Sequence, residues 1–299
     1  MTKTFSYCII TPAYNEALFI EQTIKSVLCQ TILPCKWIIV DDGSVDETEE
    51  IVRRYTDKYD WISYLYRAKP SGESYFSSNV NAIMEGWNSL AGELFKYLAI
   101  LDADITLPKN YYEKILKSFD FDTRLGVASG IYENLIGGKL CKVLNDRRST
   151  PKAIQVFRRE VFESIGGFIP LKHGGEDTIA CVMARMSGWK TWSFPDIKVV
   201  HHRPTGTGKS SSILRVRFNQ GMCEYSLATH PVFFVIKCIR RSFLEKPFMV
   251  GGILRVCGYF FAYIRKEEIL IPDDVVRYTR SEQLRRIIQL NKIGLSCLI

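Results

Sequence analysis

Residues 5–101 alternate between short apolar runs and segments whose apolar residues recur at helical spacing. The apolar runs are Phe5–Ile10, Lys36–Val40, Ile62–Tyr66 and Tyr97–Leu101, and the helical segments between them are Ala17–Cys29, Glu47–Tyr59 and Ser78–Leu90. Strands that alternate with helices usually pair in parallel, with helices on both faces of the sheet. The sequence therefore predicts an α/β fold built on a Rossmann-like sheet.

The pattern changes further along the chain. Over residues 127–200 we predict short strands and loops, with helices around Arg159–Ser164 and Asp177–Ser187. A glycine- and serine-rich stretch, Thr205–Ser212, precedes a basic and apolar section. We expect a domain over residues 1–205, divided at residue 104 into two halves, and a helical extension over residues 206–299.

The composition narrows the possible partners and the compartment. A net charge of +8 over 299 residues favours anionic partners, of which nucleic acid, nucleotide phosphates and acidic membrane surfaces all qualify. The nine cysteines form no Cys-x-x-Cys pair and lie within apolar runs, so we expect reduced core residues. The first apolar run is too short for the hydrophobic region of a signal peptide, so we expect this domain to stay in the cytoplasm.

Two carboxylates follow the fourth predicted strand. Asp102 and Asp104 come after Tyr97–Leu101, and alternation along an extended chain would place both on the same side, at the carboxyl edge where open α/β sheets bind ligands. A hard cation such as Mg²⁺ or Mn²⁺ would relieve their repulsion and bind the phosphate oxygens of a substrate. The alternative is that acidic residues here only favour turns and helix starts.

Polar turns also follow the first two strands. Thr11-Pro12-Ala13-Tyr14-Asn15-Glu16 opens a helix after the first strand, and Asp41-Asp42-Gly43-Ser44 follows the second. Helix capping explains part of this polarity. It does not require two adjacent carboxylates, whereas an aspartate at this edge could accept the imide N–H of uracil or a ribose hydroxyl.

These motifs, in this order over the first 205 residues or so, resemble those of family 2 glycosyltransferases, which have the GT-A fold. The resemblance implies a nucleotide-sugar-binding half over residues 1–104 and an acceptor half over residues 105–205. It assigns the donor to Thr11, Pro12, Ala13, Tyr14, Glu16, Asp41, Asp42, Asp102, Ala103 and Asp104. Asp104 becomes a direct metal ligand, and Asp102 lies near the ribose or a metal-bound water.

The pair Glu176-Asp177 opens a predicted helix after two glycine pairs. An acid at this position is stabilised by the helix dipole whatever its function. The resemblance implies that Asp177 is the catalytic base, which takes the proton of an acceptor hydroxyl, and that Glu176 orients or contacts the acceptor. Direct attack by that hydroxyl would invert the anomeric centre.

Two histidines end the last predicted strand of this domain. The resemblance implies a third metal ligand here. Because neighbouring residues of a strand face opposite sides, only one of His201 and His202 serves easily, and we favour His201. Arg203 and Lys209 could then close over the diphosphate as part of a lid, although a surface linker would have the same composition.

The C-terminal section interleaves basic residues with the apolar segments Pro231–Ile236 and Phe248–Ile264. The second segment is too short and too interrupted for a confident membrane span. An in-plane membrane helix and a helix buried on the core are equally compatible with the pattern, and the resemblance favours the membrane, because many relatives use lipid-linked acceptors at the inner leaflet. Gln283 and Arg286 resemble the Gln-x-x-Arg-Trp motif of processive relatives, but Ile287 replaces the tryptophan.

The sequence therefore predicts a non-processive, inverting, metal-dependent glycosyltransferase at the cytoplasmic face of a membrane, peripheral or monotopic. Its donor would be a nucleoside-diphosphate sugar, with UDP favoured over GDP and dTDP, and its acceptor a lipid-linked or other glycan. The alternative is a non-catalytic nucleotide-sugar- or glycan-binding protein on the same fold. We predict no nucleic-acid partner, because the acidic strand ends oppose one.

Overall fold

The structure, a computed structural model, describes residues 5–144, 146–203 and 212–293. The chain divides into two compact units. The first, called here the sheet unit, takes in Met1–Pro170 and Glu176–Thr205, and the second, the helical unit, takes in Leu171–Gly175 and Gly206–Ile299. Each unit is described by itself.

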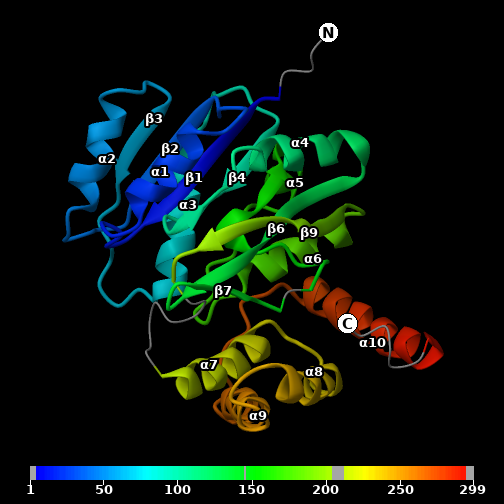
Figure 1. Cartoon of the computed structure of the whole chain (residues 1–299). Helices are drawn as coiled ribbons and strands as arrows, with labels where there is room; N and C mark the ends of the chain where they lie inside the picture. The colour runs from blue at the N-terminus through cyan, green and yellow to red at the C-terminus, as the bar shows by residue number, and fades with distance from the viewer. Residues whose placement is uncertain (1–4, 145, 204–211, 294–299) are drawn as a thin grey trace. The chain divides into compact units, whose positions relative to one another are not determined.

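The sheet unit is built on a mixed sheet whose described strands are ordered β3-β2-β1-β4-β8-β6-β9-β5, with β7 paired to β6 (Figure 1). The strands are β1 (Tyr7–Ala13), β2 (Lys36–Asp41), β3 (Ile62–Tyr66), β4 (Tyr97–Ile100), β5 (Ile105–Thr106), β6 (Leu125–Ile136), β7 (Lys139–Lys142), β8 (Val156–Arg158) and β9 (Lys190–His201). The first four are parallel and overlap the predicted strands. The expected turn over Thr11–Glu16 is corrected at its start, because β1 continues through Thr11 and Pro12 to Ala13.

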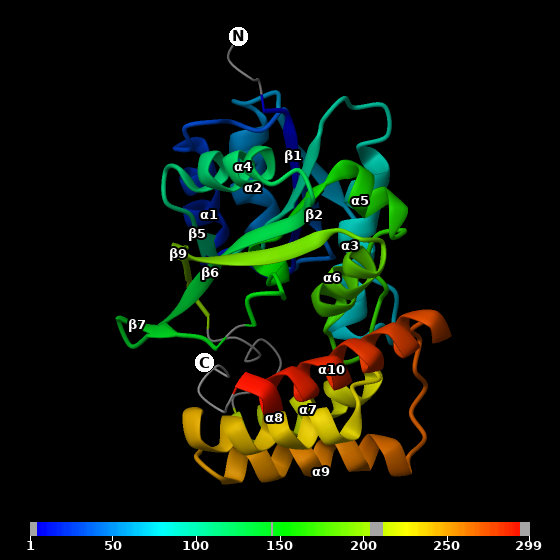
Figure 2. The ribbon, with the colours of Figure 1, turned by 90° about the vertical axis from the view of Figure 1, so that its right-hand side faces the viewer.

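Helices cover both faces of this sheet (Figure 2). One face packs on α1 (Ile20–Leu28), α2 (Thr48–Thr56) and α4 (Tyr111–Phe121), and the other on α3 (Tyr75–Ser89), α5 (Arg159–Ser164) and α6 (Glu176–Met186). Alternation along β1 explains the two cores, because Tyr7 and Ile9 enter the first and Cys8 and Ile10 the second. The α/β prediction is confirmed.

The register of the parallel strands sets the position of their carboxyl ends. Ala13 of β1 pairs with Asp41 of β2, and Ile10 pairs with Ile100 of β4. The turns that follow these three strands therefore meet at one edge of the sheet, where open α/β sheets bind ligands.

The prediction of short strands and loops over residues 127–200 is wrong in one respect. Strands β6 and β9 each contain 12 residues and pair in parallel, with register shifts near Gly130. A Cβ at Gly130 would lie 2.2 Å from the carbonyl oxygen of Ile197, so only glycine allows the two strands to approach here. These irregularities interrupt the strand periodicity in the sequence.

The helical unit contains α7 (Ile213–Ser226), α8 (Pro231–Leu244), α9 (Val250–Ile264) and α10 (Asp273–Ile293). Helix α8 begins where Pro231 follows His230, whose ring accepts a hydrogen bond from Val232 N at 3.3 Å. Phe234 and Tyr259 stack between α8 and α9, with ring centroids 4.7 Å apart. Among the helices over the described ranges, none is both long and apolar enough to cross a bilayer.

Candidate active site

The turns after β1 and β2 hold each other in place. Ser44 Oγ accepts a hydrogen bond from Asn15 N at 2.9 Å, and Asn15 Oδ1 accepts one from Val45 N at 2.9 Å. Thr48 Oγ1 accepts one from Glu16 N at 2.8 Å. Asn15 has a φ of 55°, a left-handed conformation that asparagine tolerates better than most residues. The backbone of the first turn is thus fixed by side chains of the second.

Two of the predicted donor contacts also have structural partners. Thr11 is fully buried, and its hydroxyl accepts a hydrogen bond from Trp37 Nε1 at 2.9 Å. Asp41 is also buried, and its oxygens accept bonds from Ser44 N at 2.7 Å and from Tyr64 Oη at 2.8 Å. The contact of both residues with the donor stays a prediction.

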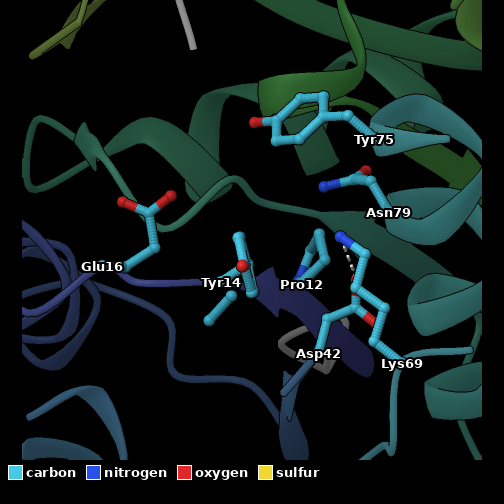
Figure 3. Close-up of a pocket in the computed structure, with 8 residues that line it drawn as sticks. Pro12, Tyr14, Glu16, Asp42, Lys69, Tyr75 and Asn79 are labelled. Carbon is cyan, nitrogen blue, oxygen red and sulfur yellow. Dashed lines mark ion pairs between the residues drawn. The ribbon is translucent and has the colours of Figure 1, made fainter. Parts of the chain in front are cut away.

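Five of the other predicted residues of this edge line a pocket, together with three residues that the sequence analysis missed (Figure 3). Its lining residues are Pro12, Ala13, Tyr14, Glu16, Asp42, Lys69, Tyr75 and Asn79. Tyr75 and Asn79 lie at the start of α3, and Lys69 Nζ lies 4.3 Å from the centre of the Tyr14 ring. The pocket therefore combines two aromatic rings, a cation and two carboxylates at the carboxyl edge of the sheet.

Asp42 lies at the base of this pocket and is held by a basic residue. One of its oxygens bonds to Arg67 Nη1 and the other to Ser78 Oγ, while Lys69 Nζ lies 3.9 Å away. Arg67 also pairs with Glu73 at 2.9 Å. Arg67 and Lys69 follow β3 and form no recognisable motif. The one signal that could have indicated them was a pair of basic residues just after a parallel strand.

Asp102 faces a different partner from Asp104. Lys152 Nζ lies 3.0 Å from Asp102 Oδ1 and donates a hydrogen bond of 2.6 Å to Asn79 Oδ1. Burial opposes the charge of Lys152, but Asp102 and Glu176 raise its pKa above the usual value. Strand β4 ends at Ile100, so strand alternation does not continue to Asp104, and the expectation that both carboxylates share one side is corrected. Ala103 is buried between them.

Asp104 contacts residues at the end of β9. His201 Nε2 lies 3.2 Å from Asp104 Oδ2, because Ile105 pairs with His201 where β5 meets β9. His201 Nδ1 lies 3.1 Å from Asn134 Oδ1, which fixes the orientation of the ring. His202 faces away, with its Nε2 2.7 Å from Thr106 Oγ1. Of the two histidines, the structure places only His201 against an acid of this edge.

Arg203 bridges Asp104 and Glu16. Its Nε donates to Asp104 Oδ2 at 2.7 Å, and its Nη2 pairs with Glu16 Oε1. Burial opposes ionisation of Asp104, but the hydrogen bond from His201 and the charge of Arg203 lower its pKa to about 2. Burial raises the pKa of Glu16 to about 7 although Arg203 opposes that shift. Asp104 and Glu16 therefore stabilise the positive charge of Arg203 at the carboxyl edge of the sheet.

The donor atoms here fit a hard divalent cation. Asp104 and Glu16 offer carboxylate oxygens and His201 an imidazole nitrogen, and Glu16 Oε2 is buried with no hydrogen-bond partner among the described residues. The described ranges nevertheless contain no ready-made group of three histidine, cysteine or acidic side chains that could hold a metal ion. An ion bound here would take further ligands from a substrate.

Glu176 and Asp177 occupy the first turn of α6. Asp177 Oδ1 accepts a hydrogen bond from Thr178 N at 2.6 Å, and its Oδ2 accepts one from Lys152 N at 3.2 Å. Burial raises the pKa of Asp177. Glu176 is buried, its Oε2 has no partner within the part of the chain that the structure describes, and burial raises its pKa to about 7. Lys152 thus connects Asp177, through its backbone, with Asp102, through its ammonium group.

Lys209 falls outside the described residues. Two further predicted residues lie in the helical unit. Gln283 and Arg286 belong to α10 of the helical unit, where Gln283 Oε1 accepts a hydrogen bond from His230 N at 2.8 Å and the Arg286 guanidinium lies 5.5 Å from the centre of the Phe233 ring. Both described side chains therefore connect α10 to α8.

The fold and the acidic edge define the class of the protein. A mannosyltransferase from Pyrobaculum calidifontis, solved in complex with GDP-Man and Mn²⁺, superposes with a TM-score of 0.57 and 17% sequence identity over 96% of this chain and 87% of that chain. This likeness and the mixed sheet identify the GT-A fold, as the sequence predicted.

The family follows from the sequence itself. The family model "Glycosyl transferase family 2" matches residues 8–179, more than half of the chain, so this protein belongs to glycosyl transferase family 2. The uncharacterized glycosyltransferase MG025 of Mycoplasma genitalium is 33% identical over 42% of this chain, a match that spans only 40% of that protein. Glycosyltransferase AglE of Haloferax volcanii is 25% identical over 83% of this chain and 84% of that protein.

Proposed function

We propose that this protein transfers one sugar from a nucleoside-diphosphate sugar to a hydroxyl group of a lipid-linked or other glycan, with inversion, in polysaccharide or glycolipid biosynthesis. The observation that carries the proposal is the pairing of Asp104 and Glu16 with one guanidinium, that of Arg203, with His201 against Asp104, next to the pocket at Asp42. The family membership and the names of the relatives as glycosyltransferases support transfer over simple binding.

The pocket would hold the nucleoside, and uridine is the base we favour. Asp42 already accepts bonds from Arg67 and Ser78. Each carboxylate oxygen has two lone pairs, so Asp42 can accept one more bond, from the imide N–H of uracil. Tyr14 offers a ring face for the base, and Lys69 a cation for phosphate oxygens.

A cation at Asp104 and His201, with Glu16 at hand, would supply charge neutralisation for the departing diphosphate. Mn²⁺ and Mg²⁺ both suit this donor set, and the mannosyltransferase complex with GDP-Man and Mn²⁺ supports a metal in this fold. Arg203 would release Asp104 and contact the diphosphate instead. Asp102, bound to Lys152, would lie near the ribose.

Asp177 would act as the base. The hydroxyl oxygen of the acceptor attacks the anomeric carbon, its proton passes to Asp177, and the bond from that carbon to the diphosphate breaks on the opposite side. Burial raises the pKa of Asp177. Its carboxylate is therefore a better proton acceptor than a carboxylate that is exposed to water. Glu176, whose Oε2 is unpaired within the described chain, would contact the acceptor.

We place the enzyme at the cytoplasmic face of a membrane, held peripherally or monotopically by the extension over residues 206–299. The basic and apolar composition of this section supports that location. Residues 1–104 would form the donor half and residues 105–205 the acceptor half of the catalytic domain.

Calorimetric titration of UDP, GDP and dTDP into the protein, each with Mn²⁺ and with a chelator, tests the donor site. We expect metal-dependent binding of one nucleotide, UDP, and loss of that binding in Asp104→Asn. Asp57→Asn, at an exposed position after α2, removes the same charge as a matched control and should bind as the wild type does. Absence of binding for all three nucleotides would reject the donor site and favour a degenerate or scaffold protein.

A further inference from the structure

Three arginines of the helical unit converge on one carboxylate. Glu245, just after α8, has Arg217 Nη1 at 3.2 Å and Arg241 Nη1 at 3.3 Å from its oxygens, and it also pairs with Arg255 Nη2. Arg255 is only 2% exposed. Three guanidinium groups around one carboxylate leave an excess of positive charge, which is costly where side chains are removed from water.

Part of this cluster lacks partners. Arg255 Nη1 and Arg217 Nε are buried without a hydrogen-bond partner among the described residues, although Gln220 Oε1 accepts from Arg255 Nε at 3.1 Å. Burial lowers the pKa of Arg217, and the neighbouring charge of Arg255 lowers it further. An unpaired buried donor on a charged group destabilises a fold, so a cluster with only a structural role would be expected to pair them. The cluster therefore keeps positive charge that its one carboxylate does not neutralise.

The first turn of α9 packs on these groups, and its Gly251 is buried. A Cβ added at Gly251 would lie 3.7 Å from each of Arg217 Cγ, Arg255 Nη1 and Pro247 Cδ. The positive end of the α9 dipole is at the same place. Lys246, which precedes Pro247, adds an exposed ammonium group.

Helices α8 and α9 also expose apolar stripes at helical spacing. The exposed side chains are Val232, Val235, Ile239 and Phe243 on α8, Phe248 and Met249 in the connection, and Val250, Ile253, Phe260, Phe261 and Ile264 on α9. Neither helix contains an acidic residue, and Glu245 is the only acid over residues 225–266. Contiguous apolar surface of this kind on a soluble protein marks an interaction site.

We propose that the exposed face of α8 and α9, named here the α8–α9 face, docks on an anionic lipid bilayer, with lipid headgroup phosphates at the part-exposed Arg241 and the exposed Lys246. The inference rests on the proposed membrane location and adds the surface and the chemical group that it recognises. Charge complementarity selects the bilayer as the occupant. A second copy of the chain would bring the same uncompensated positive charge to the interface and be repelled.

The test is co-flotation of the full-length protein, without donor, with vesicles of phosphatidylcholine alone or with added phosphatidylglycerol. We expect binding that needs the anionic lipid and weakens with salt. Arg241→Gln should weaken it about fivefold, the effect of one basic group near a charged surface. Arg53→Gln, an arginine of α2 that also pairs with a glutamate four residues away, is the matched control. Lys246→Gln tests the same charge if Arg241→Gln fails to fold.

A second variant tests the exposed apolar side chains of the α8–α9 face. Ile253→Ser combined with Phe260→Ser should weaken vesicle binding more than tenfold, whereas Phe121→Ser, which removes a 96% exposed ring from the sheet unit, should not. The proposal would be overturned if all variants bound the vesicles equally. It would also be overturned if the protein bound inorganic phosphate without vesicles, or if it formed dimers that these substitutions convert to monomers. Calorimetric UDP binding by the wild type, without lipid, reports separately on the proposed function.

Discussion

Asp177 is held by two backbone N–H groups at the start of α6, so its position does not depend on a bound ligand. We expect Asp177→Asn to retain metal-dependent UDP binding within about twofold and to lose turnover by about 10²–10⁴-fold, the usual contribution of a general base. Calorimetry and a transfer assay on the same preparation would separate the two effects. Wild-type turnover in this variant would exclude Asp177 as the base.

Arg203 competes with any cation that approaches Asp104. Because its guanidinium lies between Asp104 and Glu16, an incoming ion must displace it. We expect Arg203→Ala to bind Mn²⁺ on the order of tenfold more tightly in the absence of nucleotide, measured by electron paramagnetic resonance of free Mn²⁺. Arg53→Ala, far from this edge in the sequence and exposed on α2, serves as the control. Weaker Mn²⁺ binding by Arg203→Ala would show that the arginine supports the ion instead.

Glu176 should make the protein less stable as the pH rises. Burial raises its pKa from 4.5 to about 7 in the folded protein, so the folded state holds the proton more tightly than the unfolded chain. The contribution of protonated Glu176 to the free energy of unfolding is complete below pH 4.5 and is lost as the pH rises through 7. Glu176→Gln should therefore raise the free energy of unfolding at pH 8 by up to roughly 3 kcal/mol, and much less at pH 4.

Denaturant unfolding at both pH values measures this difference. Glu50→Gln, at an exposed position of α2, is the matched variant and should leave the pH dependence unchanged. A Glu176→Gln protein whose stability follows the wild type from pH 4 to pH 8 would contradict the raised pKa.

At the residue scale, motifs indicated the acids of the site but not their partners. Asp42, Asp104 and His201 stand in patterns that sequence reasoning can recognise. Arg67 and Lys152 are single basic residues in ordinary surroundings, and their pairing with Asp42 and Asp102 depends on strand register and on a turn far along the chain. Thr11 and Asp41 belong to the same motifs, yet burial in the sheet gives them other contacts.

At the scale of elements, β1, β2 and β4 were predictable because each is a compact apolar run buried on both faces. Strand β3 is only partly buried, and its aromatic and β-branched residues made it predictable. Strands β6 and β9 were not, because their central residues are partly exposed and their pairing shifts register. The helices that cover the sheet could be predicted from their spacing, although their ends differ by several residues from the predicted ranges, as frayed termini usually do.

Helices α7 and α9 approach each other through glycines. A Cβ at Gly221 would lie 1.9 Å from Arg255 O, and one at Gly258 would lie 2.0 Å from Phe218 O. Each substitution by alanine should therefore force the helices apart and lower the free energy of unfolding by about 2 kcal/mol or more. Gly251→Ala meets only ordinary contacts at 3.7 Å and should instead add up to about 1 kcal/mol, from helix propensity. Thermal unfolding compares the three variants, and equal effects would argue against close helix packing.

At the scale of the whole molecule, the cysteines should be free thiols. The eight cysteines within the described ranges form no disulfide, and Cys29, Cys35, Cys141 and Cys257 are exposed. A thiol reagent should modify at least these four in the native protein, while Cys8, whose pKa burial raises to about 12, should react only after unfolding. A melting temperature that falls by more than about 3 °C on addition of dithiothreitol would contradict this.

The bridge that Arg203 makes between Asp104 and Glu16 also bears on the order in which ligands arrive. An enzyme that already neutralises its own acids has little attraction for a bare ion, so it would not compete for the scarce free manganese of a cell. The diphosphate would offer Arg203 another anion to bind and would free Asp104 as the donor enters. We therefore expect metal and nucleotide to arrive together, as one complex, and the product diphosphate to leave with its ion.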